Sequence, residues 1–394
     1  MSIESIFESR FSCSPDIIVR SPGRINLIGE HTDYNQGFVL PAAINKEALI
    51  AMRKRSDEQI SLFAADLNEA HSTTLSQLHT EPHSWPAYLL GVVQQLQQSG
   101  LPLHGFDAVL SSTIPSGAGM SSSAAIECAV IFALNNLYNL ELSPIEMVKL
   151  AKKAENEFVG VQCGIMDMFV SMMGKDGHAI KLDCRNLSYE YFPIKLGEYK
   201  IVLFDTAIKH SLAAGQYNIR RAQCEEGTGV LQKKYPTITS LRDVTEELLL
   251  TELKGQVSET VFNRCRYIVS ENQRVLAGCD DLVNNDLSAF GKKMFQTHDG
   301  LSKLYDVSCK ELDFLVDSVR NEPAVVGARM MGGGFGGCTI NIIQADAIED
   351  LFERMRKSYR EIYSLELKMY TMITQSGTSI IQKNATKPKN QYQL

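Results

Sequence analysis

The stretch Pro115-Ser-Gly-Ala-Gly-Met-Ser-Ser-Ser-Ala-Ala125 decides how this sequence is interpreted. Its glycines, Gly117 and Gly119, allow tight backbone bends and a close approach to a ligand. Its last three serines begin an apolar segment typical of a buried helix, where unpaired N–H groups and the helix dipole attract anions. Residues 105–112 before it have strand character, so the unit is strand, loop and helix. We interpret it as a phosphate-binding loop; the alternative is a small-residue helix start that binds nothing.

Length and composition describe a globular protein with room for two domains. The chain has 394 residues, of which 44% are hydrophobic and 22% charged, and a net charge of −7. The charge argues against nucleic acid or an acidic membrane as the main partner. The best apolar run, 124–137, is too short for a membrane span and carries Glu127.

The cysteines and the N-terminus favour a cytoplasmic protein. Nine cysteines are scattered without a Cys-x-x-Cys pair, which fits a reducing compartment, and Cys128 in the apolar helix is most simply a packed thiol. The N-terminus lacks a basic segment followed by an apolar one, so nothing suggests secretion. We also expect a monomer.

The order of elements predicts an α+β architecture with two domains. Strands and helices mix in both halves without the regular alternation of a doubly wound parallel sheet. Pro22 and Gly23 predict a turn between a strand at 17–20 and another at 38–50. We expect a first domain over 1–205, a second over 206–382 and a disordered tail over 383–394. Helices are predicted at 85–98, 121–140, 144–158, 217–234, 261–276 and 287–304.

A second polar constellation lies in Ser21-Pro-Gly-Arg-Ile-Asn-Leu-Ile-Gly-Glu-His-Thr-Asp-Tyr-Asn35. It places Arg24, Glu30, His31 and Asp33 within ten positions. Carboxylates and an imidazole can match the donors and acceptors of a hydroxyl-rich ligand such as a sugar. The alternative is a solvated loop whose charges pair locally.

A third group of residues surrounds a lone acid among apolar neighbours. Asp167 follows Gly160-Val-Gln-Cys-Gly-Ile-Met, and a carboxylate in that setting needs a cation or hydrogen bonds, for which we nominate Arg24. Upstream, Glu155 could reach a metal beside the serine loop. Its simpler interpretation is an exposed helix residue next to Lys152 and Lys153.

Two familiar nucleotide-binding motifs do not account for this sequence. The lysine-bearing P-loop pattern is absent, since residues 115–125 contain no lysine. The run Gly332-Gly-Gly-Phe-Gly-Gly337 formally matches G-x-G-x-x-G, but a strand pattern follows it where a Rossmann motif requires a helix. Five glycines in six residues instead predict a tight bend or a close approach to another group.

Three segments together resemble the signature motifs of the galactokinase, homoserine kinase, mevalonate kinase and phosphomevalonate kinase superfamily: 22–34, 115–125 and 328–337. The first is similar to the galactokinase signature, and the resemblance runs from about residue 17 to about residue 382. It implies an N-terminal domain like ribosomal protein S5 domain 2, a ferredoxin-like C-terminal domain, and an active site in the cleft between them. It also implies ATP-dependent phosphorylation of the anomeric (C1) hydroxyl of galactose.

The same resemblance implies roles for individual residues. Arg24 and Asp167 would be the catalytic pair, and residues 332–337 would close the far side of the site. Arg24 and Asp167 would also touch the sugar, together with Glu30, His31, Asp33, Gly164 and Tyr217. ATP would be bound by Trp85 near the adenine and, around the phosphates, by Pro115, Ser116, Gly117, Ala118, Gly119, Met120, Ser121, Ser122 and Ser123. Mg²⁺ would be held by Ser123 and Glu155.

Several alternatives stay open at this point. A kinase for a related sugar such as N-acetylgalactosamine needs room near the sugar C2. A non-catalytic sensor of galactose and ATP is expected to lose part of the serine loop, which is complete here. A homoserine or mevalonate kinase is disfavoured by the first motif. One departure is Met168, where many galactokinases have glutamine, so a polar contact there is lost or supplied elsewhere.

Overall fold

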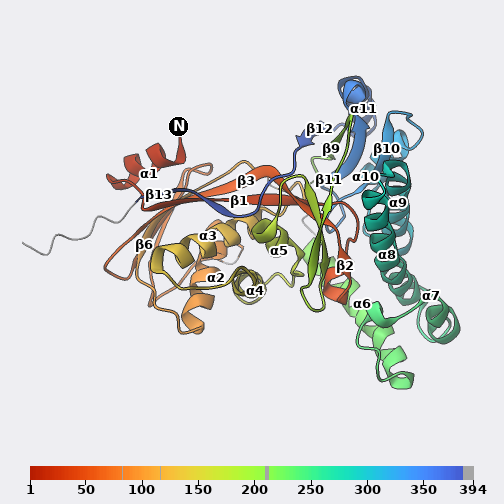
Figure 1. Ribbon diagram of the computed structural model, residues 1–394, viewed down its shortest axis with the longest axis horizontal. Helices are drawn as coiled ribbons and strands as arrows, with labels where there is room; N and C mark the ends of the chain where they lie inside the picture. The colour runs from red at the N-terminus through yellow and green to blue at the C-terminus, as the bar shows by residue number, and fades with distance from the viewer. Residues whose placement is uncertain (82, 116, 209–212, 385–394) are drawn as a thin grey trace, which may run out of the picture.

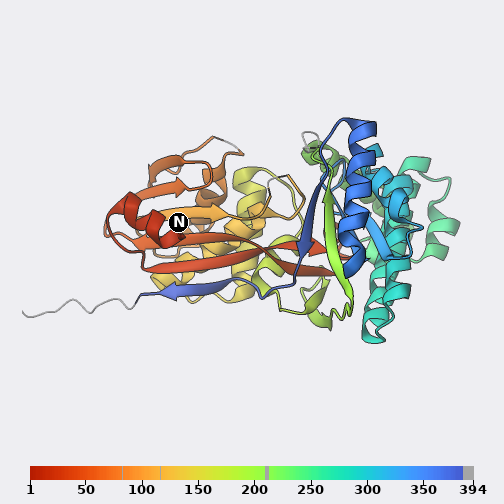
Figure 2. The ribbon, with the colours of Figure 1, turned by 90° about the horizontal axis from the view of Figure 1, so that it is seen from above.

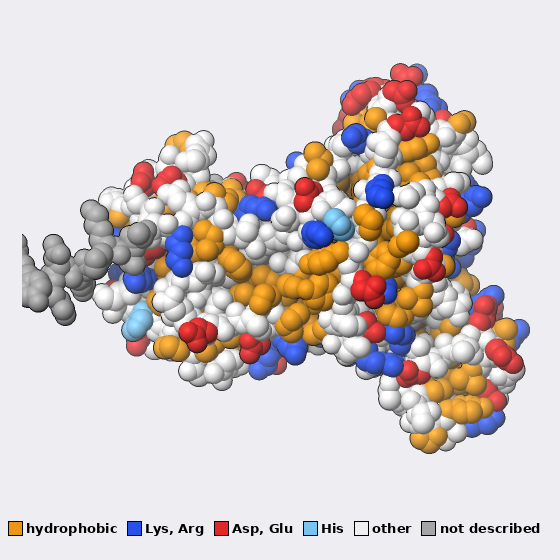
Figure 3. Space-filling model, viewed as in Figure 1, with side chains coloured by type: hydrophobic (Ala, Val, Ile, Leu, Met, Phe, Trp, Pro, Cys, Tyr) orange, Lys and Arg blue, Asp and Glu red, His pale blue; other side chains and the backbone are white. Residues whose placement is uncertain are grey.

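The computed structural model describes residues 1–81, 83–115, 117–208 and 213–384. These residues form two lobes that lie side by side along the longest axis (Figures 1 and 2). On the face shown in Figure 3, acidic and basic side chains are interspersed over both lobes. No helix in the described ranges combines the length and the apolar character needed to cross a membrane.

The first lobe is built on a six-stranded sheet in the order β13-β1-β3-β6-β4-β5. Successive residues of β1 face opposite sides, so Ile17 and Val19 enter the main core under α2 to α5 while Ile18 packs under α1. The strands are β1 (Ile17–Asn26), β3 (Pro41–Lys54), β4 (Gln59–Ala64), β5 (Glu69–Thr74), β6 (Phe106–Ser112) and β13 (Ser379–Lys383). The helices are α1 (Ile3–Phe11), α2 (Trp85–Gln98), α3 (Ser122–Tyr138), α4 (Pro144–Ala154) and α5 (Met166–Met173).

The second lobe is built on a four-stranded antiparallel sheet in the order β10-β11-β9-β12. Its strands are β9 (Tyr199–Asp205), β10 (Val325–Met330), β11 (Cys338–Gln344) and β12 (Lys368–Met372). Its helices are α6 (Ala213–Lys234), α7 (Glu246–Leu248), α8 (Glu259–Val283), α9 (Leu287–Asp299), α10 (Lys310–Val319) and α11 (Ile348–Tyr363). A small sheet of β2 (Phe38–Val39), β7 (His178–Asp183) and β8 (Tyr189–Pro193) completes the fold.

One apolar core joins the two lobes. Ile25 and Leu27, at the end of β1, pack in the same cluster as Val275 of α8 and Ile340 of β11. The segment that follows β1 is therefore held between the first sheet and the helices of the second lobe. This placement brings the polar residues 30–35 to the junction.

The predicted helices are confirmed, with changes at their ends. α2 has the predicted bounds, and Ser143 caps α4 through a reciprocal pair with Glu146. The helix predicted at 144–158 leaves the α form at Ala154 and continues as a π-helix over Glu155–Val159. A second π-helix, Gly300–Leu304, ends the helix predicted at 287–304. Such wider turns often occur at functional sites.

The predicted turn at Pro22 and Gly23 is wrong, because β1 runs through it with a shift of register between Pro22 and Arg24. A β carbon at position 23 would lie 2.7 Å from the carbonyl oxygen of Met120. The Arg24 N–H donates to that carbonyl at 3.1 Å. Glycine is needed here for the close approach of the serine loop to the strand, and no turn is made.

Strand pairing corrects the predicted division in two places. β9 lies in the predicted first domain but pairs with β11 and β12, whereas β13 lies in the predicted second domain and pairs with β1. Lys383, assigned to the disordered tail, ends β13, and the Asn384 N–H donates to Asp16 at 2.9 Å. The remainder of that tail, 385–394, lies outside the described residues.

Candidate active site

A cavity of about 480 Å³ lies where the serine loop, the end of β1 and the glycine-rich run 332–337 meet. It brings together residues of all three sequence motifs. Of the predicted site residues, those that line it are Arg24, Glu30, His31, Asp33, Pro115, Gly117, Gly119, Met120, Ser121, Ser122, Ser123, Gly164, Asp167 and Tyr217.

The serine loop forms one wall by turning sharply into α3. Gly117 and Gly119 have φ of 78° and 74°, and Ser121 adopts the left-handed conformation before the helix begins at Ser122. The 17-residue helix then directs its unpaired N-terminal amides and its positive dipole end toward the cavity. This wall is suited to bind phosphate.

One residue assigned to that loop, Ala118, does not line the wall. Ala118 is fully buried in the core that joins the lobes and so anchors the loop. Ser116 lies outside the described residues.

Asp167 and Arg24 form the predicted ion pair at the centre of the cavity. The Arg24 Nε donates to Asp167 Oδ1 and its Nη2 to Oδ2, both at 2.7 Å. The hydroxyl of Ser121 also donates to Oδ2, and Arg24 Nη1 donates to the carbonyl of Gly119. The arginine side chain is 7% exposed and the aspartate side chain 25%. The acid is thus fixed against the phosphate loop while one edge stays accessible.

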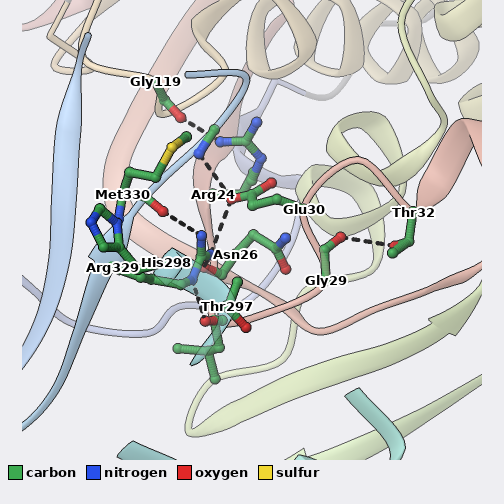
Figure 4. A network of polar contacts seen from close by, with 12 residues as sticks. Arg24, Asn26, Gly29, Glu30, Thr32, Gly119, Thr297, His298, Arg329 and Met330 are labelled. Carbon is green, nitrogen blue, oxygen red and sulfur yellow. Dashed lines mark hydrogen bonds and ion pairs between the residues drawn. The ribbon is translucent and has the colours of Figure 1, made fainter. Parts of the chain in front are cut away.

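Glu30 is held by a residue that the sequence analysis missed. The guanidinium of Arg329, fully buried in β10, donates to Glu30 Oε1 at 3.0 Å, and the Gly332 N–H donates to the same oxygen at 2.8 Å. Arg329 also donates to the carbonyls of Asn26, Leu27 and Met330 (Figure 4). In the sequence, Arg329 is the single charged residue of the apolar strand Val325–Met330, and this pattern indicates a buried cation that needs an acidic partner.

The glycine-rich run forms the bend and the close approach that its composition predicts. Gly332, Gly334, Gly336 and Gly337 all have positive φ. A β carbon on Gly334 would lie 2.0 Å from the carbonyl oxygen of Val307. At Gly334 the run therefore passes against its neighbour with no room for a side chain.

His31 is buried and Asp33 is half-buried, and the pKa of each is shifted. Burial lowers the pKa of His31 to about 4, so its imidazole is neutral at pH 7. Burial, with the charge of Asp167, raises the pKa of Asp33 to about 7. A β carbon at Gly164 would lie 1.5 Å from Asp33 Oδ2, so the absence of a side chain at Gly164 leaves space for that carboxylate.

The two predicted metal ligands lie beside one another. Glu155 is 6% exposed at the start of the π-helix, behind the cavity wall, and burial raises its pKa to about 7. The thiol of Cys163 donates to it at 3.3 Å, and the nearby hydroxyl of Ser123 lowers its pKa by less than burial raises it. The exposed-helix alternative for Glu155 is therefore wrong.

A divalent cation suits this donor set. In the described ranges no three His, Cys, Asp or Glu residues gather to enclose a metal. The chain offers one hydroxyl and one carboxylate, which fits Mg²⁺, an ion that takes few protein ligands and fills its shell with phosphates and water.

Trp85 is not brought into the cavity. Its Nε1 donates to Glu69 Oε2 at 2.9 Å, and Tyr88, one turn along α2, lines the cavity instead. Met168 is fully buried in the main core of the first lobe, among apolar side chains, so it does not replace the polar contact that glutamine would make. The lining residues that the sequence analysis did not single out individually are Tyr88, Gly160, Val161, Gln162, Cys163, Met166, Asn218 and Gly333.

Comparisons with protein families identify three matching regions. The description "GHMP kinases N terminal domain" matches residues 87–175, "Galactokinase galactose-binding signature" matches residues 5–54, and "GHMP kinases C terminal" matches residues 280–361. The second of these covers the segment that supplies Arg24, Glu30, His31 and Asp33.

Individual relatives agree along nearly the whole chain. A galactokinase from Roseiflexus sp. is 38% identical over 96% of both chains, and one from Thermotoga maritima is 39% identical over 92% of this chain and 99% of its own. A crystal structure of Lactococcus lactis galactokinase complexed with galactose superimposes with a TM-score of 0.91 at 33% identity, covering 96% of this chain and 98% of that one. A mevalonate kinase from Methanococcus jannaschii, at 21% identity and a TM-score of 0.65, shares the fold.

Proposed function

Because the chain belongs to the galactokinase family of the GHMP kinases, we propose that it transfers the γ-phosphoryl group of ATP to the C1 hydroxyl of galactose. Its relatives are kinases of this sugar, and its fold is theirs. The family supports the phosphorylation of galactose by ATP. The cavity supports the assignment of individual roles.

The observation that carries the mechanism is how Asp167 is bonded. An ionised carboxylate offers about four lone-pair sites. Oδ2 receives the bonds from Arg24 Nη2 and Ser121, while Oδ1 receives only that from Arg24 Nε. Oδ1 therefore keeps one site free, and we assign it to the acceptor hydroxyl of the sugar.

The bonding favours an orienting role for Asp167. Two N–H groups of Arg24 and the Ser121 hydroxyl hold the carboxylate in one orientation, and Oδ1 keeps a site for the sugar hydroxyl. In the reaction a bond forms between O1 of the sugar and the γ-phosphorus, and the bond to the bridging oxygen of ADP breaks. The hydroxyl proton passes to Asp167 or to the transferred phosphoryl oxygens, and Arg24 offsets the developing charge.

The wall formed by the serine loop would hold the triphosphate. The N-terminal amides of α3 and the hydroxyls of Ser122 and Ser123 are the donors there, since the loop has no lysine. Ser123 and Glu155 would hold Mg²⁺, which neutralises phosphate charge when bound. Alignment and charge neutralisation supply most of the catalytic effect in such transfers.

The remaining polar side chains would select the sugar. Asp33, His31 and Tyr217 line the cavity beside the catalytic pair. A buried polar group left without its hydroxyl partner costs roughly 1–3 kcal/mol, enough to disfavour an epimer. We therefore expect glucose to be a poor substrate.

The experiment is an ADP-release assay with Mg·ATP across galactose, N-acetylgalactosamine, glucose, mevalonate and homoserine. Galactose should give the highest kcat/KM. A preference for N-acetylgalactosamine would move the assignment to a kinase of that sugar, and binding of galactose and ATP without ADP release would indicate a sensor. The complete serine loop and the bonded Asp167 favour catalysis over sensing.

We further propose that the protein acts as a monomer in the cytoplasm. All nine cysteines are free thiols, as a reducing compartment would keep them. Light scattering in solution tests the oligomeric state.

A further inference from the structure

A file of polar groups runs from the cavity into the second lobe behind His31. The Nδ1 of His31 lies 2.9 Å from the Tyr34 hydroxyl, which lies 2.8 Å from the Tyr305 hydroxyl. The Tyr305 hydroxyl lies 3.3 Å from the Cys224 sulfur. His31 is 5% exposed, and Tyr305 and Cys224 are fully buried. We call these four residues the hydroxyl file.

The file connects the sugar-binding segment to the other lobe. His31 and Tyr34 follow β1, while Tyr305 follows the π-helix at 300–304 and Cys224 lies in α6. The Arg220 Nε donates to the Tyr305 carbonyl at 2.8 Å and fixes its backbone. The rings of His31 and Tyr305 pack with their centroids 4.8 Å apart.

Counting protons gives the file a direction. Burial keeps His31 neutral and raises the pKa of both tyrosines well above 10, so each phenol carries one proton. If Cys224 donates to Tyr305, Tyr305 to Tyr34 and Tyr34 to Nδ1, every proton of the three donors is used. In the reverse direction the thiol proton has no acceptor, because the other polar group at the Cys224 sulfur among the described residues is the Asn35 amide, whose N–H donates and lowers the pKa of the thiol.

The direction fixes the tautomer of the imidazole. With Nδ1 accepting from Tyr34, the single imidazole proton must reside on Nε2. Nε2 is buried and makes no hydrogen bond of normal geometry within the described ranges, although the backbone of Gly333 lies near enough to the imidazole to oppose part of the fall in its pKa. A buried donor in that state is ready for an acceptor oxygen of a ligand in the cavity that His31 lines.

We propose that Tyr305, which lines no part of the cavity, is a positioning residue that holds His31 as an Nε2–H donor toward a hydroxyl oxygen of the sugar. The proposal rests on the proposed function and adds to it a residue from the second lobe. Tyr305 acts through Tyr34, and Cys224 supplies the first proton of the file.

The test compares Tyr305→Phe with Tyr359→Phe. Each change removes one buried hydroxyl in a hydrogen bond, and the Tyr359 hydroxyl donates to the Thr206 carbonyl at 3.0 Å away from the cavity. In Tyr305→Phe the galactose KM should rise about fivefold, the effect of one lost hydrogen bond, with kcat and the ATP KM unchanged. In Tyr359→Phe the galactose KM should stay at the wild-type value.

A spectroscopic readout keeps the test independent of activity. The ¹⁵N shifts of the His31 imidazole in the free protein should report Nε2–H in the wild type and a mixture of tautomers in Tyr305→Phe. Cys224→Ser keeps a proton donor and should resemble the wild type, whereas Cys224→Ala should shift the tautomers in the same sense as Tyr305→Phe. These two variants serve as well if Tyr305→Phe fails to fold.

The possible results separate the two proposals. A wild-type His31 protonated on Nδ1, or a Tyr305→Phe variant with unchanged tautomer and galactose KM, would overturn the hydroxyl file. An equal rise of the galactose KM in Tyr359→Phe would do the same. A wild-type protein that does not phosphorylate galactose would instead refute the proposed function. The NMR measurement would still test the hydroxyl file, because it is made on the free protein.

Discussion

Replacing Gly164 by alanine should displace Asp33, the acid that we propose binds the sugar, and leave the fold intact. The added β carbon would lie 1.5 Å from Asp33 Oδ2 and 2.3 Å from its Cγ, where ordinary contacts need roughly 3.5 Å. The carboxylate must therefore retreat by about 2 Å, which takes it out of hydrogen-bond range of a ligand. Gly164 lacks a positive φ, so alanine meets no backbone strain there.

The size of the effect follows from the bond that is lost. A hydrogen bond to a charged group contributes about 1.5–3 kcal/mol, which corresponds to a rise of about 10- to 150-fold in the galactose KM. Because the pKa of Asp33 is about 7, the assay belongs at about pH 8, where the carboxylate is mostly ionised. The proposed site for ATP is the wall formed by the serine loop, so the ATP KM should not change.

The assay measures initial rates of ADP release while galactose and then ATP is varied, together with thermal melting. Gly229→Ala is the matched control, since a β carbon there has open space in α6. It should leave both KM values unchanged. If Gly164→Ala kept the wild-type galactose KM, or raised the ATP KM equally, the assignment of Asp33 to the sugar would be wrong.

Three further perturbations test other parts of the site. Arg329→Met leaves Glu30 buried without its cation and should lower the free energy of unfolding by about 3–5 kcal/mol in urea titrations; a loss below about 1 kcal/mol would contradict the buried pair. Burial, with the charge of Asp167, raises the pKa of Asp33 to about 7, so the folded state keeps a proton that the unfolded chain releases from about pH 4. The contribution of Asp33 to the free energy of unfolding should therefore fall between about pH 4 and pH 7, so the wild type should lose stability relative to Asp33→Asn over this range; equal slopes for the two proteins would speak against the retained proton. Glu155→Gln should raise the Mg²⁺ concentration needed for half-maximal rate with the galactose KM unchanged, and an unaltered Mg²⁺ dependence would remove Glu155 from the metal site.

Much of the site could be predicted because each of its motifs has a local signature in the sequence. The loop at 115–125 carries its function in glycines and serines whose backbone behaviour is local, and the structure forms the bend and helix start that they predict. The pair of Arg24 and Asp167 could be predicted from chemistry, since a carboxylate among apolar neighbours needs a cation. These inferences did not need the tertiary fold.

Other features depended on distant contacts and could not be predicted. Gly23 has the local signature of a turn, but its smallness serves the approach of Met120, almost 100 positions away. The last strand pairs with β1, so pairing across the whole chain decides which lobe it joins. Trp85 had only the family resemblance to place it, and its contact with Glu69 depends on the sheet register.

The most direct test of the account is phosphoryl transfer by Asp167→Asn, measured as the rate of ADP formation at saturating galactose and Mg·ATP, with binding of both substrates measured separately. The account predicts a loss of about 10²- to 10⁴-fold in turnover with both substrates still bound, because an amide cannot keep the bonds from Arg24 and Ser121 and also accept the sugar hydroxyl. Near-normal turnover in this variant would contradict it.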